Sequence, residues 1–179
     1  ETFCLKHRDC PEYIVEDGVA IRAVKRVYRE LSNDERELEP KDIFDIAEGT
    51  AEGNAEAAKE AFATLGRVAG DAMATAVTLM DGLIVIGGGL SAASKYFMPA
   101  LINEMRSRIR TMSGDELNRV QMNVYNLNDE AEFKKFASGS STKIKVYGTD
   151  KEVVYDPEKR IGITISDIGA SNAVALGAY

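Results

Sequence analysis

The chain has 179 residues, 45% of them hydrophobic, so one domain can enclose a hydrophobic core. Its 22 Lys and Arg against 29 Asp and Glu give a formal net charge of -7, which supplies no general attraction to nucleic acid or an anionic membrane. No apolar run approaches the roughly 18 residues of a membrane-spanning helix. Two cysteines are too few for a secreted disulfide framework, so we expect a soluble protein of the reducing cytoplasm.

The amino terminus, Glu1-Thr2-Phe3, shows neither an initiator Met nor a signal-peptide pattern, and we expect a piece of a longer chain. Basic clusters at 25–26 and 106–110 stand at helical spacing among apolar residues. We interpret both clusters as solvated helix faces rather than as binding sites for an acidic partner.

The first half of the sequence predicts helices. Residues 1–12 are polar and irregular, and a helix is expected from Asp17, where apolar residues recur at helical spacing. Asp42 is placed to cap a second, short helix. The longest helical segment, 54–80, is crowded with alanine and glycine, which predicts a buried helix that lies close against a neighbouring element.

The second half alternates strands and helices. Residues 83–86 form a β-branched run typical of a buried strand in a mostly parallel sheet. A glycine turn and a helix follow; Ser91 can cap this helix, and apolar residues recur along it every four positions up to Ile109. A further strand is expected near 120–127. Strand, turn, helix and strand together indicate an α/β fold.

Beyond Asn128 the pattern changes. Residues 143–147 and 152–155 alternate as strands on either side of a turn, which predicts a hairpin. A last strand over 161–166 leads into a helix of small residues over 170–179.

The glycine turn, Gly87-Gly88-Gly89, is the clearest ligand-binding signal. Glycines adopt positive φ and allow a ligand to approach closely, and the helix that follows presents free N–H groups that attract phosphate. The segment 87–92 also matches the G-x-G-x-x-A dinucleotide fingerprint, but no acidic residue ends a following strand at the required distance. A Walker loop is excluded because no Gly-Lys-Ser or Gly-Lys-Thr follows. A tight turn without a ligand stays open as the alternative.

The sequence around this turn is similar to that of the ROK family of sugar kinases and repressors. Three segments carry the resemblance: 61–67, 81–91, and 161–171 with 177–178. The resemblance extends from about Glu12 to the last residue, with 128–160 as an expected insertion. It implies the carboxy-terminal lobe of an actin-like ATPase (ribonuclease H-like) fold, a mixed sheet flanked by helices with an inserted β-hairpin. The whole chain, 1–179, is then one lobe, and the amino-terminal lobe is absent from it.

The resemblance also implies functional residues. The contacts that the family makes to adenosine correspond to Gly87, Gly88, Gly89, Leu90 and Gly169. The segment 10–12 resembles the family's Gly-Cys-x-Glu, whose glutamate binds sugar hydroxyls, so Glu12 is the expected sugar contact. A carboxylate suits vicinal hydroxyls because it accepts two charge-assisted hydrogen bonds. The alternative is that Glu12 faces water ahead of the next helix.

The same family segment usually holds a structural zinc, and this chain departs from it. Cys4 and Cys10 are separated by five residues rather than four, one cysteine is missing, and His7 lies between them. Cys4, His7 and Cys10 are chemically suitable ligands, but three ligands leave a structural tetrahedral site open. We expect free thiols here, with zinc as the alternative.

The family's phosphate loops, catalytic Asp and Glu-x-Gly-His motif do not occur in this chain, and in family order they precede the segment of Glu12. Asp81 and Asp167 stand at strand ends and are interpreted as turn residues, so no catalytic residue is expected here. The resemblance implies a parent enzyme that phosphorylates a hexose, with glucose 6-phosphate as the expected product, using ATP and Mg²⁺. The chain alone should be inactive without the amino-terminal half, and we expect a homo-oligomer.

Two other functions stay open. A sugar-responsive ROK repressor would carry its DNA-binding part upstream, and a non-catalytic domain would only complete another chain. The glycine turn favours the kinase. The sugar itself stays open, because N-acetylmannosamine, fructose and allose kinases share this pattern.

Overall fold

The computed structural model describes residues 4–179; the segment 1–3, where we noted no signal pattern, lies outside the described residues. The helices are α1 Glu16–Val19, α2 Ile21–Ser32, α3 Pro40–Ala47, α4 Ala55–Leu79, the short 3-10 helix η1 Gly89–Ala93, α5 Ser94–Met105, α6 Glu130–Ser138 and α7 Ala170–Ala178. The strands are β1 Ile84–Ile86, β2 Arg108–Arg110, β3 Glu116–Asn118, β4 Asn123–Asn126, β5 Thr142–Lys145, β6 Glu152–Tyr155 and β7 Arg160–Ile165. Among residues 4–179, no helix has both the length and the apolar character needed to cross a membrane.

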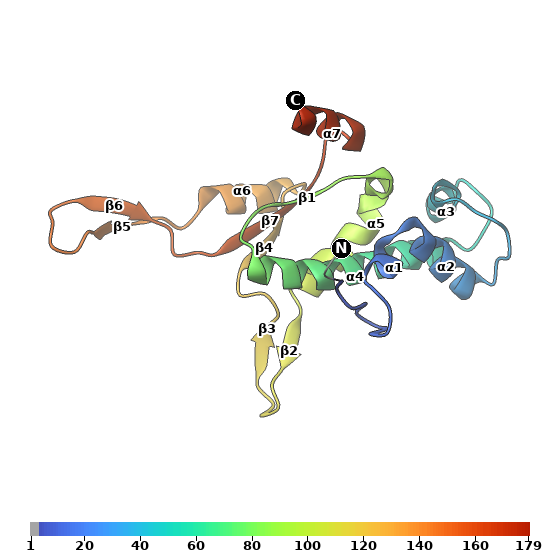
Figure 1. Cartoon of the computed structure of the whole chain (residues 1–179), viewed down its shortest axis with the longest axis horizontal. Helices are drawn as coiled ribbons and strands as arrows, with labels where there is room; N and C mark the ends of the chain where they lie inside the picture. The colour runs from blue at the N-terminus through green and yellow to red at the C-terminus, as the bar shows by residue number, and fades with distance from the viewer. Residues whose placement is uncertain (1–3) are drawn as a thin grey trace.

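A parallel sheet in the order β1-β7-β4 forms the centre of the fold. The central strand, β7, places Ile161 and Ile163 in the core, where each is almost completely buried. Helices flank this sheet, so the predicted α/β class is confirmed. Antiparallel pairing occurs in two hairpins, β2–β3 and β5–β6, which project from the body in different directions (Figure 1).

Helix α4 packs closely against α5 because two glycines face the neighbouring backbone. A Cβ on Gly66 would collide with the carbonyl oxygen of Phe97, and one on Gly70 would lie 2.5 Å from the carbonyl oxygen of Leu101. The carboxamide of Asn54 caps α4 by accepting a hydrogen bond of 3.1 Å from the Ala57 N–H. The long, closely packed helix predicted over 54–80 is therefore confirmed.

Two helix starts differ from the prediction. The helix expected from Asp17 is broken into α1 and α2 at Ala20, whose ψ of 167° is extended. Helix α3 begins at Pro40, so Asp42 lies inside its first turn rather than at the cap. There the Asp42 carboxylate accepts the N–H of Glu39 at 2.8 Å, which is one half of a capping box.

The region after the glycine turn contains further differences. Strand β1 is an edge strand with Val85 61% exposed, so the prediction of a buried strand was wrong. Helix α5 ends at Met105, and Ile109 lies in β2, so the basic cluster at 106–110 is not a helix face. The Ser91 hydroxyl donates to the Gly88 carbonyl and closes the turn instead of capping α5. The hairpin β2–β3 and helix α6 were not predicted.

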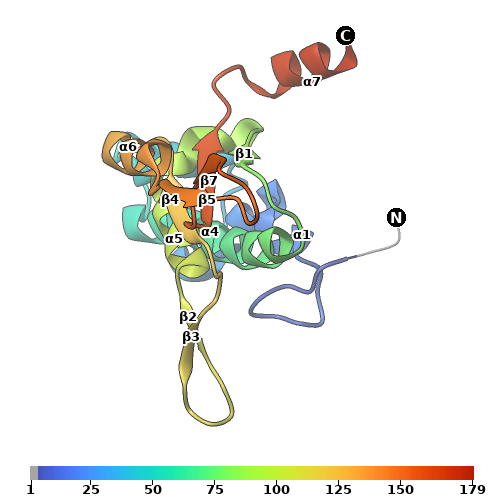
Figure 2. The same ribbon diagram turned by 90° about the vertical axis from the view of Figure 1, so that its left-hand side faces the viewer.

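Helix α7 and the strand before it match the prediction for the end of the chain. Both views show α7 standing away from the body (Figures 1 and 2). Its Val174 and Leu176 are exposed.

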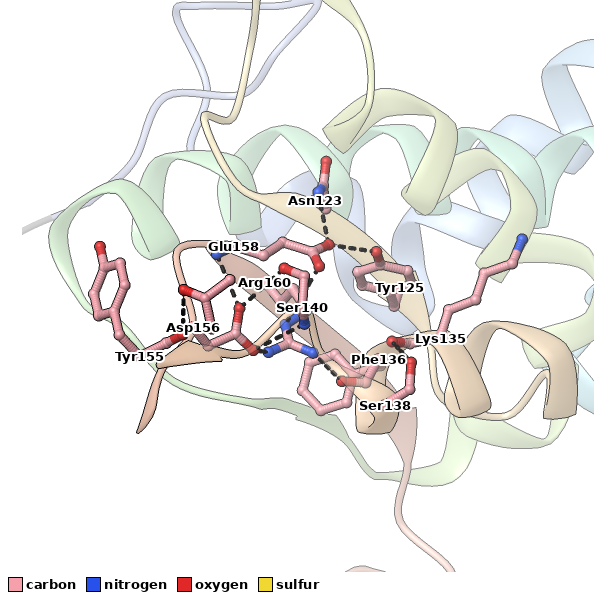
Figure 3. Close-up of polar contacts among 11 residues, drawn as sticks. Asn123, Tyr125, Lys135, Phe136, Ser138, Ser140, Tyr155, Asp156, Glu158 and Arg160 are labelled. Carbon is pink, nitrogen blue, oxygen red and sulfur yellow. Dashed lines mark hydrogen bonds and ion pairs between the residues drawn. The ribbon is translucent and has the colours of Figure 1, made fainter. Parts of the chain in front are cut away.

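Arg160 fixes the base of the hairpin β5–β6, which was predicted at this place (Figure 3). Its guanidinium donates to the Phe136 carbonyl at the end of α6 at 2.5 Å and pairs with the carboxylate of Asp156. Ser140 donates from its hydroxyl to the same carboxylate at 3.2 Å, so both ends of the hairpin are joined. The Arg160 side chain is only 16% exposed. The hairpin is therefore attached through a half-buried ion pair.

Acid is expected to loosen this base before it affects the body. The backbone N–H of Glu158, with help from Ser140 and Arg160, holds the pKa of Asp156 below its ordinary value of 3.8. Hydrogen bonds from Tyr125 and Asn123 hold the pKa of Glu158 below its ordinary 4.5. Since both folded-state pKa values are lowered, their stabilisation is complete above the ordinary values and is lost as the pH falls through the folded values.

Amide hydrogen exchange tests this expectation. Between about pH 5 and about pH 3, protection factors in β5 and β6 should fall by more than those in α4. A parallel loss in the hairpin and in α4, or no loss in the hairpin, would contradict the assignment.

Candidate functional site

The glycine turn lies at the carboxyl end of β1 and continues into η1. Gly88 adopts a φ of 102°, a conformation that residues with a Cβ rarely reach. The N–H and the hydroxyl of Ser91 both donate to the Gly88 carbonyl, at 3.1 and 2.7 Å. A Cβ built on Gly88 or Gly89 would meet no described atom within 4 Å. The turn is thus closed by its own hydrogen bonds and leaves bare backbone facing open space.

An apolar cavity of about 440 Å³ opens beside this turn. The turn and Leu90 form one wall, and Leu65, Ala69 and Met73 of α4 form another. The third wall comes from Val15, Val19, Ala20 and Ile21, around the break between α1 and α2. Of the described lining residues, Ser91 alone has a polar side chain, and its hydroxyl already donates to Gly88. Such a cavity suits a flat apolar group, such as a nucleobase, next to backbone amides.

Gly169 lies at the same edge of the sheet but not in the cavity wall. Ile86 of β1 pairs in parallel with Ile165 of β7, so both strands end together. The Ser166 N–H donates to the Ile86 carbonyl at 2.8 Å and extends this pairing. Gly169 follows with a φ of 72° and begins α7, but it is not among the cavity's lining residues. The structure therefore brings residues 87–90 together and leaves Gly169 beside them.

Glu12 lies on a separate loop formed by residues 4–15. An antiparallel bridge between Lys6 and Ile14 closes this loop, and Glu12 is exposed on it. Val15, which ends the loop, already lines the apolar cavity. Val15 therefore connects the Glu12 loop to the cavity wall, and Glu12 itself is not among the cavity's lining residues.

The three residues considered as the alternative zinc ligands, Cys4, His7 and Cys10, lie on the same loop. Cys4 is exposed and Cys10 is half-buried, and both are free thiols. The imidazole of His7 is turned inward and accepts hydrogen bonds from backbone N–H groups. Among residues 4–179, no three His, Cys, Asp or Glu side chains are grouped to hold a metal ion. Asp81 and Asp167 are exposed and far from forming such a group.

Sequence reasoning identified the turn but missed two walls of its cavity. The contribution of 15–21 was overlooked, although a run of apolar residues directly after the Glu12 segment was a usable signal. The contribution of Met73 could not be recognised from the local sequence, because it depends on where α4 lies relative to the turn in the folded chain.

A second large hollow lies elsewhere. A groove of about 810 Å³ runs between the end of α4 and the base of the hairpin, and its lining includes Asp156 and Arg160. These charged groups already bind one another, so we assign this groove to the support of the hairpin.

Comparison with known proteins gives the family. The model of the ROK family matches residues 3–131. The crystal structure of glucokinase from Parabacteroides distasonis ATCC 8503 is 51% identical, with a TM-score of 0.89, and the match covers 100% of this chain and 48% of that one. A proposed sugar kinase from Cytophaga hutchinsonii ATCC 33406 is 20% identical over the same shares, with a TM-score of 0.54, which shows the fold alone. No curated protein matches the chain.

The chain therefore spans about half the length of the two structures it matches. Its α/β fold is that of the actin-like ATPases, as the resemblance implied. The family model covers most of the sequence, and the glycine turn and the Glu12 loop both lie inside the matched residues. The chain belongs to the ROK family.

Proposed function

We propose that this chain is the nucleotide-binding, carboxy-terminal lobe of an ATP-dependent sugar kinase, with a hexose as acceptor and glucose as the expected sugar. Membership of the ROK family and the 51% identity to a glucokinase support the proposal. The observation that carries it is the apolar cavity beside the bare backbone of 87–89. A sugar-responsive repressor is not favoured, because no part of its role requires this nucleotide surface.

In the proposed complex, the cavity binds the base of ATP and the turn binds its ribose and phosphates. The base fits between the apolar walls to which Leu90 and Met73 belong, where contact area rather than hydrogen bonding provides the affinity. The open backbone at Gly88 and Gly89 lets the ribose and phosphates approach without a clash. Mg²⁺ would neutralise charge on the transferred phosphate, and we expect the amino-terminal lobe to hold it.

Glu12 is the proposed sugar contact. Its exposed carboxylate lies on the loop that ends at Val15, the first residue of the cavity wall. The sugar would therefore lie beside the nucleotide, as transfer between them requires. No described residue is placed as a base for the sugar hydroxyl, so the proposal requires the amino-terminal lobe to supply it. Closure of two lobes over the substrates would exclude water and protect ATP from hydrolysis.

Replacing Gly88 with valine is expected to weaken ATP binding to this chain by at least about tenfold, because valine cannot adopt the required positive φ without strain. Gly82→Val is the matched control, since Gly82 precedes β1 and its Cβ would meet no described atom within 4 Å. Binding is measured by titration of the labelled chain with ATP. Equal affinity of the Gly88→Val and Gly82→Val variants for ATP would show that the turn is not part of the nucleotide site.

The cavity should discriminate weakly between purines. Because its described lining offers no free polar side chain, GTP and ITP are expected to bind this chain within about tenfold of ATP. Competition titration against a fluorescent ATP analogue measures the three affinities. A preference for ATP of about a thousandfold or more would show that a polar group reads the base.

Glu12→Gln should raise the KM for the sugar by about tenfold and leave the KM for ATP unchanged, because both hydrogen bonds lose their charge assistance and one acceptor oxygen is replaced by a donor. The assay follows ADP release in the complete enzyme, with this chain preceded by its amino-terminal half. An unchanged sugar KM would end the role of Glu12. Absence of turnover with every hexose tested would defeat the kinase proposal itself.

A further inference from the structure

The loop of residues 4–15 is closed by a small set of backbone hydrogen bonds. Its backbone closes through the Lys6–Ile14 bridge, the His7 N–H to the Tyr13 carbonyl at 2.8 Å, and the Val15 N–H to the Leu5 carbonyl at 2.9 Å. These bonds join the two sides of the loop at its base. They leave the N–H groups of the turn at residues 9 and 10 without a backbone carbonyl partner among the described residues.

His7 supplies the missing acceptor. Its Nδ1 accepts the N–H of Asp9 and the N–H of Cys10, each at 3.2 Å. The ring therefore has its lone pair on Nδ1 and its proton on Nε2. His7 is 6% exposed, and among residues 4–179 only Tyr28, at 2%, is a more deeply buried residue with a polar group on its side chain. One imidazole thus holds the inside of the turn that carries Glu12.

The opposite edge of the ring is fixed against the body of the protein. A Cβ built on Gly18 would lie 2.5 Å from His7 Nε2 and 2.6 Å from Cγ1 of Val68, so α1 approaches the ring only because residue 18 has no side chain. Val68 belongs to α4 and is completely buried. On the outer side, Arg8 forms an ion pair of 3.1 Å with Glu104 of α5. The ring therefore connects the loop to the two elements behind it.

The same arrangement does not fit the structural zinc that this family segment usually holds, which was the alternative to free thiols. A histidine ligand needs a free ring nitrogen directed at the metal, but Nδ1 is occupied by two N–H donors and Nε2 faces Gly18. Cys4 is exposed, Cys10 is half-buried, and the described residues contain no three-ligand group. We propose that in this chain the neutral imidazole of His7 holds the Glu12 loop in place of a metal ion, which makes His7 a positioning residue.

Two substitutions separate hydrogen bonding from packing. His7→Asn keeps an acceptor oxygen close to the position of Nδ1, whereas His7→Leu keeps much of the volume and has no acceptor. We expect the Leu variant to lose about tenfold of the exchange protection of the Asp9 and Cys10 amides, and the Asn variant to recover most of it. Amides of α4 should keep their protection in both variants, which shows that the body is folded. Arg8→Gln, which removes the ion pairs of Arg8 with Glu104 and Asp9 but keeps the imidazole of His7, is the matched control.

Three results would overturn the proposal. Unchanged protection in His7→Leu would show that the acceptor is not needed, and equal loss in the Asn and Leu variants would assign the effect to packing. Elemental analysis of the purified chain should find far less than one zinc per chain, and a chelator should leave the loop protected. One zinc per chain, together with loss of exchange protection at the Asp9 and Cys10 amides when the zinc is removed, would show that a metal ion holds the loop.

A consequence for catalysis rests on the proposed function. In the complete enzyme, His7→Leu should raise the KM for the sugar and leave the KM for ATP unchanged, and His7→Asn should restore it. The exchange measurement does not depend on turnover. An inactive enzyme would therefore contradict the kinase proposal and leave the proposed role of His7 unaffected.

Discussion

Parallel pairing of β1 with β7 is the constraint on which the rest of this structure depends. The register of Ile86 opposite Ile165 makes both strands end at one edge of the sheet, and the Ser166 N–H continues the ladder past that edge. The glycine turn and the approach to Gly169 therefore leave the sheet side by side. In open parallel sheets, this edge is where ligands bind.

Close packing of α4 against α5 completes the site at that edge. Gly66 and Gly70 let α4 lie against the backbone of α5, and α4 then presents Met73 to the space beside the turn. The break at Ala20 matters equally, because it directs the residues on either side of it into the same cavity. The apolar wall suits the base of the proposed nucleotide, and the open backbone suits its phosphates. The carboxylate of Glu12, on the loop that ends at Val15, suits the hydroxyls of the proposed sugar.

Much of this fold could be predicted from the sequence, because its strongest elements carry local signals. Helix α4 has an Asn cap and a long run of small residues, and the hairpin β5–β6 shows clear alternation. The error at Ile109 arose because apolar spacing of four residues continued past the end of α5, where the chain in fact turns into β2. The turn at 113–115 was an available signal for that second hairpin.

The site was predictable only in part, because some of its contacts join segments that are distant in the sequence. Glycines 87–89 form a local motif, so their bare backbone could be recognised without a structure. The role of His7 could not, since it depends on the approach of Gly18 and Val68 from elsewhere in the chain. Its place between two cysteines suggested a metal ligand, whereas the fold directs the ring inward. The exposure of Val85 could not be predicted from the sequence either, because a β-branched run has the same pattern in edge strands and in central strands.

The central claim is that ATP lies on the turn at 87–89 with its base in the apolar cavity. Amide and methyl NMR shifts of the labelled chain during titration with ATP test it most directly. The account predicts that the perturbed signals cluster at 87–91, Val15, Ile21 and Met73, with the hairpin β5–β6 unaffected. Perturbations gathered instead at the groove between α4 and the hairpin, with the turn unchanged, would contradict it.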